Sequence, residues 1–326
     1  MPEGPARVLV TGGAGYIGAA LVAKLLGLKE IDLVVSLDLA HSRTYRQALD
    51  RHASKKLVTI DQDIREPLAA VISEHGVNTV IHLVFLLQTH RDEAYAHSIN
   101  VEATGQLLEA IAETGVKRFV YLSSTTVYGA SASNNRPFRE SDRTLPTPGF
   151  QYSRHKVETE RIISQFANDH PEPDGVKITV LRACPVMSPG ASNFISESLG
   201  MKFLPVPMGH DPDMQFIHLD DLLAAIVLVL QAENAAGLFN IAGEGTVRWS
   251  ELARISGATR IPVPLALLKS VISAGWALRL QNKSPGPGLA LITYPWLAST
   301  ERALVALGWK PEFTSRQAVE IWSASR

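Results

Sequence analysis

In residues 1–125, short runs of apolar residues alternate with longer stretches in which apolar residues recur every three or four positions. The short runs are rich in Val, Ile and Leu and predict buried strands, whereas the longer stretches predict amphipathic helices. The predicted strands cover residues 8–10, 33–37, 57–60, 79–83 and 118–122, and the predicted helices cover 17–28, 67–75 and 95–114. Such alternation predicts a parallel sheet with right-handed crossovers and helices on both faces.

The second half of the chain continues this pattern more weakly. A polar, proline-rich loop at 134–149 precedes a predicted helix at 151–168, and a further helix is predicted at 220–231. Strands are predicted at 178–182, 216–219 and 238–241. We therefore expect an α/β protein with a doubly wound parallel sheet formed by residues 1–183 and 213–242. Residues 184–212 and 243–326 carry most of the later prolines and are expected to form a smaller, substrate-binding lobe over the cleft.

Residues 265–280 are the nearest candidate for a membrane span, but Lys269 and Arg279 interrupt the segment and it is too short to cross a membrane. Its apolar residues recur at helical spacing, which favours a helix packed on the protein's own core. A lid helix or a helix at a membrane interface is the alternative.

Composition and charge exclude several classes of partner. The hydrophobic content of 46% and charged content of 19% are those of a globular protein, and the net charge of −1 gives no electrostatic reason to expect nucleic acid or a membrane as a partner. Cys184 is the only cysteine, so no intramolecular disulfide can form, and the histidines show no metal-ligand spacing. Residues 1–4 lack the pattern of a signal peptide, so we expect a cytoplasmic protein.

Three glycines follow the first predicted strand, at the point where the first helix begins. Gly12, Gly15 and Gly18 suit a tight turn, a close approach of phosphates to the backbone, and close packing of helix on strand. The helix N-terminus after such a turn favours a dinucleotide pyrophosphate. Asp38 ends the second strand about 20 residues later, where a carboxylate binds the adenosine ribose hydroxyls and repels a 2′-phosphate. The turn and Asp38 predict NAD as the cofactor, with Arg43 and Arg46 keeping the preference over NADP moderate.

A phenol and an ammonium group lie four residues apart in the predicted helix 151–168. Tyr152 and Lys156 therefore share one face of that helix. A free tyrosine is a poor base at neutral pH, but a nearby ammonium and an oxidised nicotinamide favour the phenolate. Tyr152 can then exchange a proton with a substrate oxygen while hydride moves at the same carbon. Ser124 lies at the end of the fifth strand and can hold that oxygen by a hydrogen bond.

These features together resemble the extended short-chain dehydrogenase/reductases, specifically the NAD-dependent epimerase/dehydratase family with its Rossmann fold. The resemblance covers nearly the whole chain. It rests on Thr11, Gly12, Gly15, Gly18, Asp38, residues 63–65, 80–83, 100–101 and 123–129, Tyr152, Lys156, and residues 181–182 and 216–222. It implies an enzyme with Ser124, Tyr152 and Lys156 as catalytic residues. The cofactor-binding residues that it implies are Gly12, Gly15, Tyr16, Ile17, Gly18, Asp38, Asp63, Ile64, Leu83, Asn100, Tyr152 and Lys156.

Two roles stay open for Asn100: a position near the cleft, and capping or bonding of backbone groups. A small-molecule substrate is expected, without a metal, and a homodimer is left open.

Three departures from the family bear on the substrate. Many nucleotide-sugar members carry an asparagine where this chain has Pro185, and an Arg-Asp pair where it has Met214 and Gln215. After His82 the chain continues with the apolar residues 83–87 rather than toward a polar or basic residue. A buried diphosphate needs charged partners, so these changes weigh against a UDP-sugar unless Arg182 or Arg248 compensates. A dehydratase of this family carries an extra acidic residue next to the serine position, whereas this chain has Thr125 and Thr126 there. These two residues argue against a dehydratase.

Several functions therefore remain open. Hydride transfer at a secondary alcohol or ketone by an NAD-dependent oxidoreductase or epimerase is favoured. A UDP-sugar 4-epimerase and a dehydrogenase or reductase of an apolar hydroxy or keto substrate are the alternatives. A non-catalytic NAD-sensing protein is the minority reading, because Tyr152 and Lys156 are both present.

Overall fold

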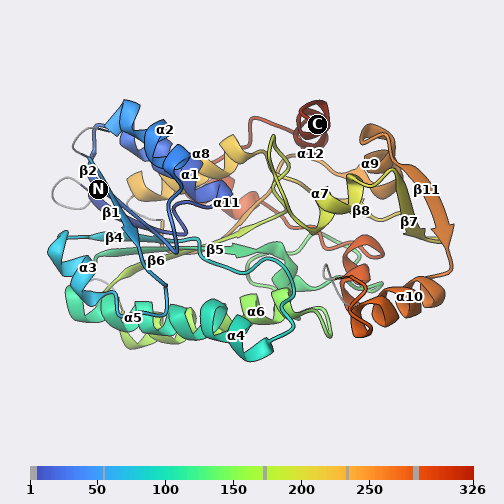
Figure 1. Cartoon of the computed structure of the whole chain (residues 1–326), viewed down its shortest axis with the longest axis horizontal. Helices are drawn as coiled ribbons and strands as arrows, with labels where there is room; N and C mark the ends of the chain where they lie inside the picture. Colours follow the sequence, from blue (N-terminus) through green and yellow to red (C-terminus); the bar gives the residue numbers. More distant parts are fainter. Residues whose placement is uncertain (1–5, 54–55, 172–174, 233–234, 282–285) are drawn as a thin grey trace.

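A seven-stranded parallel sheet forms the larger part of the computed structural model (Figure 1), which describes residues 6–53, 56–171, 175–232, 235–281 and 286–326. Residues 1–4, on which the expectation about a signal peptide rests, lie outside the described part. Across the sheet the strands are β3 (Leu57–Asp61), β2 (Ile31–Asp38), β1 (Ala6–Thr11), β4 (Thr79–His82), β5 (Arg118–Ser124), β6 (Lys177–Ala183) and β9 (Gly237–Ile241). All neighbouring pairs are parallel. The strand order reverses between β1 and β4, and such a switch point is where ligands bind in doubly wound sheets.

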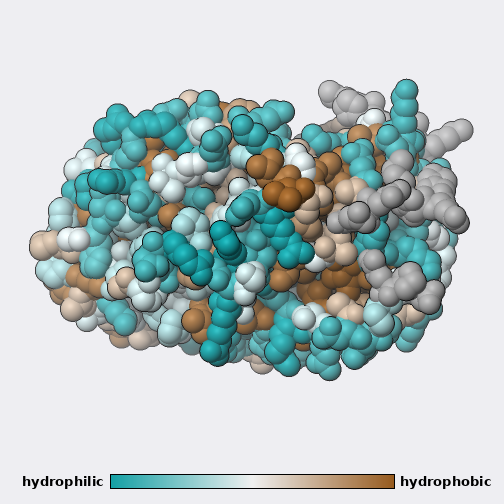
Figure 2. All heavy atoms as spheres, turned by 180° about the vertical axis from the view of Figure 1, so that it is seen from behind, coloured by the Kyte–Doolittle hydropathy of each residue, from teal (hydrophilic) through white to brown (hydrophobic). Residues whose placement is uncertain are grey.

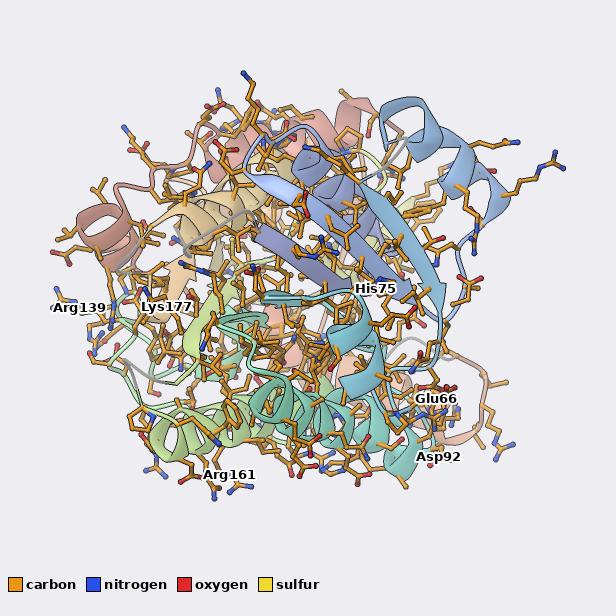
Figure 3. All side chains as sticks on the ribbon, turned by 90° about the vertical axis from the view of Figure 1, so that its left-hand side faces the viewer. Glu66, His75, Asp92, Arg139, Arg161 and Lys177 are labelled. Carbon is orange, nitrogen blue, oxygen red and sulfur yellow. The ribbon has the colours of Figure 1, made fainter. Side chains whose placement is uncertain are left out.

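Helices cover both faces of this sheet, so the predicted fold class is confirmed (Figure 1). One face carries α1 (Tyr16–Leu26), α2 (Arg43–Ala53), α8 (Leu219–Gln231) and α11 (Glu301–Leu307). The other carries α3 (Ala69–Glu74), α4 (Glu93–His97), α5 (Ala103–Thr114) and α6 (Gln151–Asp169). Two separate clusters of buried apolar side chains fill the spaces between these helices and the sheet. Figure 3 shows charged side chains at the periphery, with Arg161 of α6 directed away from the sheet.

Helix α2 lies in a segment for which no helix was predicted. The helix predicted at 95–114 is divided in the structure. A π-helical turn, η1 (Ser98–Glu102), joins α4 to α5 and brings Asn100 to a buried position. Turns of this kind are often found at functional sites.

The strand predicted at 216–219 was wrong. Only Ile217 forms a bridge, to Val186, and α8 begins at Leu219. The reason is local: the His218 side chain accepts a hydrogen bond from the Asp220 N–H and so caps the helix. Phe216 and Ile217 are buried as a strand would be, which explains why their apolar pattern resembled one.

The remaining elements gather at the other end of the molecule (Figure 1). They are α7 (Phe194–Leu199), β7 (Phe203–Pro207), β8 (Asp213–Met214), β10 (Val247–Arg248), α9 (Trp249–Ile255), β11 (Thr259–Val263), α10 (Leu265–Ala277), the 3-10 segment η3 (Gly286–Ile292) and α12 (Ser315–Ala324). β7 pairs with β11 in parallel, and β8 with β10 antiparallel. They share a third apolar core around Trp249 and Trp322. The exact division into two lobes stays a prediction.

The surface at the back of the molecule is mostly hydrophilic, with apolar residues gathered in a few places (Figure 2).

Candidate active site

The glycine turn connects β1 to α1 at the carboxyl edge of the sheet. Gly12 has φ of +73°, a conformation that favours glycine, and a Cβ there would lie 3.0 Å from the Val84 nitrogen. A Cβ on Gly18 would overlap the Gly12 carbonyl oxygen, so α1 lies directly against the turn. Gly15 is the N-cap residue of α1 and no side chain caps the helix. The first N–H groups of α1 are therefore available to an anion, as a pyrophosphate requires.

Asp38 lies beside this turn at the end of β2. Its carboxylate accepts hydrogen bonds from the backbone N–H of Ala14, at 2.9 Å, and of Leu39, at 2.8 Å. Arg46, which could have attracted a 2′-phosphate, is paired with Asp61 at 2.7 Å and with Thr59. The geometry thus fits a cofactor whose adenosine ribose carries two free hydroxyls.

Asp38 does not line the cavity that the turn opens into, and neither do three other predicted cofactor residues. Asp63 is bound by Arg65 at 2.6 Å, and Ile64 is buried in the core between the sheet and α3. Asn100 accepts a hydrogen bond from the Leu86 N–H at 2.8 Å. Of the two roles considered for Asn100, bonding of backbone groups is the one present: it holds the loop after β4.

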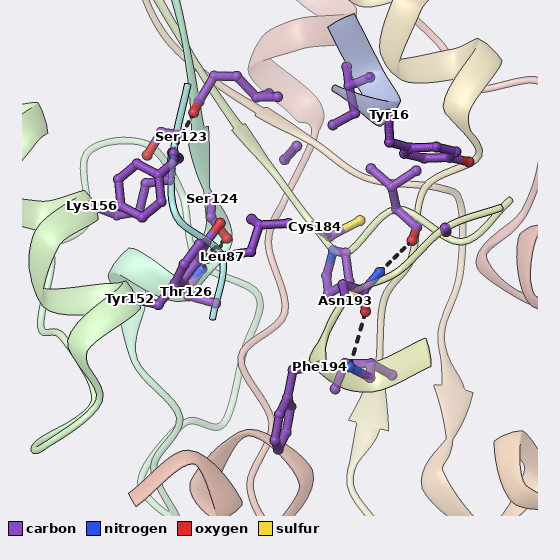
Figure 4. Close-up of a pocket in the computed structure, with 18 of the residues that line it drawn as sticks. Tyr16, Leu87, Ser123, Ser124, Thr126, Tyr152, Lys156, Cys184, Asn193 and Phe194 are labelled. Atoms are coloured by element: carbon purple, nitrogen blue, oxygen red, sulfur yellow. Dashed lines mark hydrogen bonds between the residues drawn. The ribbon is translucent and has the colours of Figure 1, made fainter. Parts of the chain in front are cut away.

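Ser124 and Tyr152 face the same cavity from different elements (Figure 4). Ser124 ends β5 and caps a 3-10 turn, η2 (Thr125–Tyr128), accepting hydrogen bonds from Thr126. Tyr152 lies in the first turn of α6. Burial raises the pKa of Tyr152 to about 12, although a hydrogen bond with Ser124 acts in the opposite direction. The protein groups alone therefore do not lower the pKa of this phenol, and the joint effect expected of Lys156 and an oxidised nicotinamide stays a prediction.

Lys156 is buried beneath the cavity, with 3% of its surface exposed. Its ammonium nitrogen donates to the Leu122 carbonyl at 2.7 Å and to the Tyr121 hydroxyl at 3.1 Å. It also lies 3.7 Å from the ring centre of Phe85. Burial lowers the pKa of Lys156 to about 7, and the nearby Glu160 carboxylate opposes that shift.

Beyond these polar groups most of the cavity wall is apolar. Thr126, Ser192 and Asn193 also line it, and the Asn193 side chain donates to the Val186 carbonyl and caps α7. Phe85 and Leu87 come from the loop after β4, and Phe150 precedes α6. Phe194 at the start of α7 and Trp296 close the wall from the second lobe. Among the described residues that line the cavity, Lys156 is the only one with a cationic side chain, and none is acidic or a histidine.

The residues at the positions that could contact a diphosphate are apolar, bonded elsewhere in the protein, or outside the cavity. Pro185 lines the cavity but offers no N–H, and Met214 is buried in the core of the second lobe. The Gln215 side chain exchanges hydrogen bonds with the backbone of Ala298. Arg182 is 4% exposed and paired with Glu160 at 2.6 Å, so its guanidinium is committed to the interior. Arg248 is exposed on β10 and does not line the cavity.

The cavity brings most of the predicted residues together. These are Gly12, Gly15, Tyr16, Ile17, Gly18, Leu83, Ser124, Tyr152 and Lys156. Sequence reasoning missed Tyr121 and Phe194. Tyr121 faces α6 within the fifth strand, a position that its spacing from Ser123 could have indicated, whereas nothing local marks Phe194.

Comparisons with known proteins find relatives of several activities. An uncharacterized protein of Mycobacterium tuberculosis is 26% identical over 333 residues, covering 100% of this chain and 85% of its own length. The dTDP-4-dehydro-6-deoxyglucose reductase of Escherichia coli is 25% identical, covering 93% of this chain and 92% of its own. The UDP-glucose 4-epimerase of Erwinia amylovora is 34% identical over 174 residues, which covers 51% of this chain and 50% of its own.

Solved structures share the fold. The UDP-glucuronic acid 4-epimerase of Bacillus cereus, in complex with UDP-glucuronic acid and NAD, has a TM-score of 0.76 at 20% identity and covers 98% of both chains. The UDP-glucose 4-epimerase of Thermotoga maritima, with UDP-glucose, has a TM-score of 0.73 at 22% identity and also covers 98% of both chains.

The model of the NAD dependent epimerase/dehydratase family matches residues 8–242, which include the glycine turn, Ser124, Tyr152 and Lys156. The chain therefore belongs to the NAD-dependent epimerase/dehydratase family of the extended short-chain dehydrogenase/reductases and is an NAD-dependent enzyme.

Proposed function

We propose that this enzyme transfers hydride reversibly between NAD and a secondary alcohol or ketone with an apolar body. The observation that carries the proposal is the cavity wall of Phe85, Leu87, Phe150, Phe194 and Trp296. Apolar and aromatic side chains suit a substrate that gains by leaving water.

The chemistry at the end of this wall is a proton exchange coupled to hydride transfer. NAD, when bound at the glycine turn, supplies the hydride acceptor and a positive charge that favours the Tyr152 phenolate. Tyr152 takes the hydroxyl proton of the alcohol and returns it to the oxygen in the reverse direction. Ser124 holds the same oxygen, and Lys156 orients the cofactor ribose.

A nucleotide diphosphate fits this site poorly. Its charge would be removed from water beside Pro185, Phe194 and Leu87, with no arginine among the described lining residues to compensate. A UDP-sugar 4-epimerase is the second candidate, favoured by the 34% identity over half the chain with the Erwinia amylovora enzyme. The two candidates use the same Ser124, Tyr152 and Lys156, so the substrate decides between them.

The test is a direct comparison of substrates. Purified protein is incubated with NAD and a series of secondary alcohols of increasing apolar size, and NADH formation is followed by fluorescence. In parallel, UDP-glucose and UDP-galactose are tested for interconversion by chromatography. We expect kcat/KM to rise with the apolar size of the alcohol and no interconversion of the UDP-sugars.

A wall variant and a matched control sharpen the result. Phe194→Ala should raise KM for the larger alcohols while leaving the affinity for NAD unchanged, because Phe194 lies in the part of the wall formed by the second lobe. Phe203→Ala removes an exposed phenylalanine outside the cavity and should change neither value. Interconversion of UDP-sugars without turnover of any apolar alcohol would establish the epimerase instead. The cytoplasmic location and the homodimer stay predictions, and light scattering tests the latter.

A further inference from the structure

Helix α10 is apolar on its exposed side as well as on its buried side. Leu268 is its one buried side chain, whereas Leu267 and Val271 expose 55% and 59% of their surfaces. Leu278, directly after the helix, exposes 69%. Together with Ala274, the three exposed residues recur at positions i, i+4, i+7 and i+11, so they lie on one face of the helix. We call Leu267, Val271, Ala274 and Leu278 the α10 face.

A helix at the surface of a globular protein normally presents polar residues to water. A helix that is apolar all round is stable in a core or against a lipid phase. Other apolar side chains are exposed: Leu280, two residues after Leu278, at 79%, Phe203 of β7 at 55% and Ile261 of β11 at 43%. The strands β7 and β11 lie at the same end of the molecule as α10 (Figure 1). Gathered apolar residues of this kind mark an interaction surface. The helix packs on the protein's own core through Leu268, as the sequence favoured, and its other side is exposed.

The chain around the α10 face has a strong charge asymmetry. Residues 252–300 contain five basic residues and no acidic residue, although the whole chain carries a net charge of −1. Arg279 is exposed directly after Leu278, at the C-terminal end of the α10 face, and Arg260 is exposed on β11, whereas Lys269 is exposed on the opposite side of the helix. An apolar face with a cation at one end and no acidic residue in its own segment is complementary to an anionic lipid surface, where cations meet head groups and apolar side chains enter below them.

The side of α10 opposite the α10 face contacts segments that line the catalytic cavity. The Arg91 guanidinium lies 4.2 Å from the ring centre of Trp276 and donates to the Trp276 carbonyl at 2.9 Å. Arg91 ends the loop whose Phe85 and Leu87 line the cavity. On its other side, α10 packs against η3, which contributes Leu291 to the cavity. The helix is thus joined to two walls of the cavity.

We propose that the α10 face docks on an anionic lipid surface and so presents the cavity to an apolar substrate held in that surface. The substrate part rests on the proposed function, whereas the docking does not. The docked helix would lie in the interface, with Leu267 and Val271 below the head groups. No helix in the described ranges is long and apolar enough to cross a membrane.

The experiment is sedimentation of the whole chain with vesicles. Phosphatidylcholine vesicles are compared with vesicles of phosphatidylcholine and phosphatidylglycerol, at low and at high salt. We expect binding to the mixed vesicles, and weaker binding at high salt because ions screen the attraction. Leu267→Glu/Val271→Glu should reduce the partition coefficient roughly tenfold or more, because two apolar side chains no longer enter the lipid.

A matched control is available on α11, on another part of the surface. Leu304 and Val305 expose 52% and 80% of their surfaces, and Leu304→Glu/Val305→Glu adds the same charge. This variant should bind vesicles like the wild type. Both variants are checked for NAD binding and thermal unfolding, so that a misfolded protein is recognised.

The outcomes separate the possible occupants of the face. Equal loss of binding in the α10 and α11 variants, or no binding by the wild type, overturns the proposal. A wild-type dimer that becomes a monomer in the α10 variant, without vesicle binding, overturns it as well and assigns the face to a second copy of the chain. Selective loss in the α10 variant supports docking even if no apolar alcohol is turned over, so a failure of the proposed function is seen separately.

Discussion

Lys156 should make the stability of this protein depend on pH in a window where few other groups titrate. Burial lowers its pKa from 10.5 to about 7, against the opposing effect of Glu160. An unfolded chain keeps an ordinary lysine, so between pH 7 and pH 10.5 it binds more protons than the folded protein does. The free energy of unfolding therefore rises with pH across this window, and this contribution is lost as the pH falls toward 7.

The magnitude follows from the shift. One pKa unit corresponds to about 1.4 kcal/mol, so the contribution of Lys156 should grow by on the order of 2 kcal/mol between pH 7 and pH 9. Lys156→Met keeps an apolar stem of similar length and removes the titrating group. Any cost of leaving Leu122 and Tyr121 without their donor does not change with pH, so the difference in slope isolates the ammonium group.

The assay is urea unfolding at pH 7, 8 and 9, followed by tryptophan fluorescence in wild type, Lys156→Met and Lys24→Met. Lys24 is exposed on α1, so its variant controls for the loss of a lysine as such. We expect the wild type to gain stability relative to Lys156→Met as the pH rises. If the free energies of unfolding of the wild type and Lys156→Met differed by a constant amount from pH 7 to pH 9, the reasoning would be refuted, because the buried nitrogen would then carry its charge at no cost.

Three further predictions concern the site. Tyr152→Phe should lower turnover by roughly 10²–10⁴-fold with NAD affinity retained, and turnover within a few-fold of wild type would exclude Tyr152 as the acid–base group. Asp38→Ala should narrow the preference for NAD over NADP in a binding titration, and a wild type that prefers NADP would contradict the role of Asp38. NAD should raise the melting temperature by several degrees and UDP by little, since a ligand stabilises only through its occupancy of the folded state. Micromolar binding of UDP-glucose would contradict the last prediction.

The central sheet could be predicted because its strands are buried on both faces. A buried parallel strand is a continuous apolar run, and such runs are visible at 33–37 and 118–122 without knowledge of the neighbours. Predicted catalytic residues likewise follow strand ends or open a helix, as Ser124 and Tyr152 do. The run at 216–219 shows where this reasoning fails. Its apolar residues are buried, as predicted, but His218 caps α8 there, so the segment leads into a helix and does not form a strand.

Contacts between distant segments could not be predicted. Phe85, Phe194 and Trp296 come from three separate parts of the chain, and only folding places them around one cavity. The exposure of one side of α10 could not be predicted from the sequence for a similar reason. Its apolar spacing is that of a packed helix, and the spacing does not say whether the protein supplies a partner for every face.

The buried contacts of Arg182 bear on which substrate the cavity can bind. An arginine near the end of β6 could in principle bind a phosphate, but here its nearest partners are Glu160 of α6, at 2.6 Å, and the Tyr128 hydroxyl, at 2.9 Å. Glu160 in turn accepts a hydrogen bond from Ser123. Withdrawing Arg182 from Glu160 to reach a ligand would leave a buried carboxylate without its partner, a cost of about 3–5 kcal/mol. The ion pair joins β6 to α6, and Ser123 joins β5 to the same carboxylate, so the contacts that hold the elements bearing Ser124 and Tyr152 also keep this guanidinium out of the cavity.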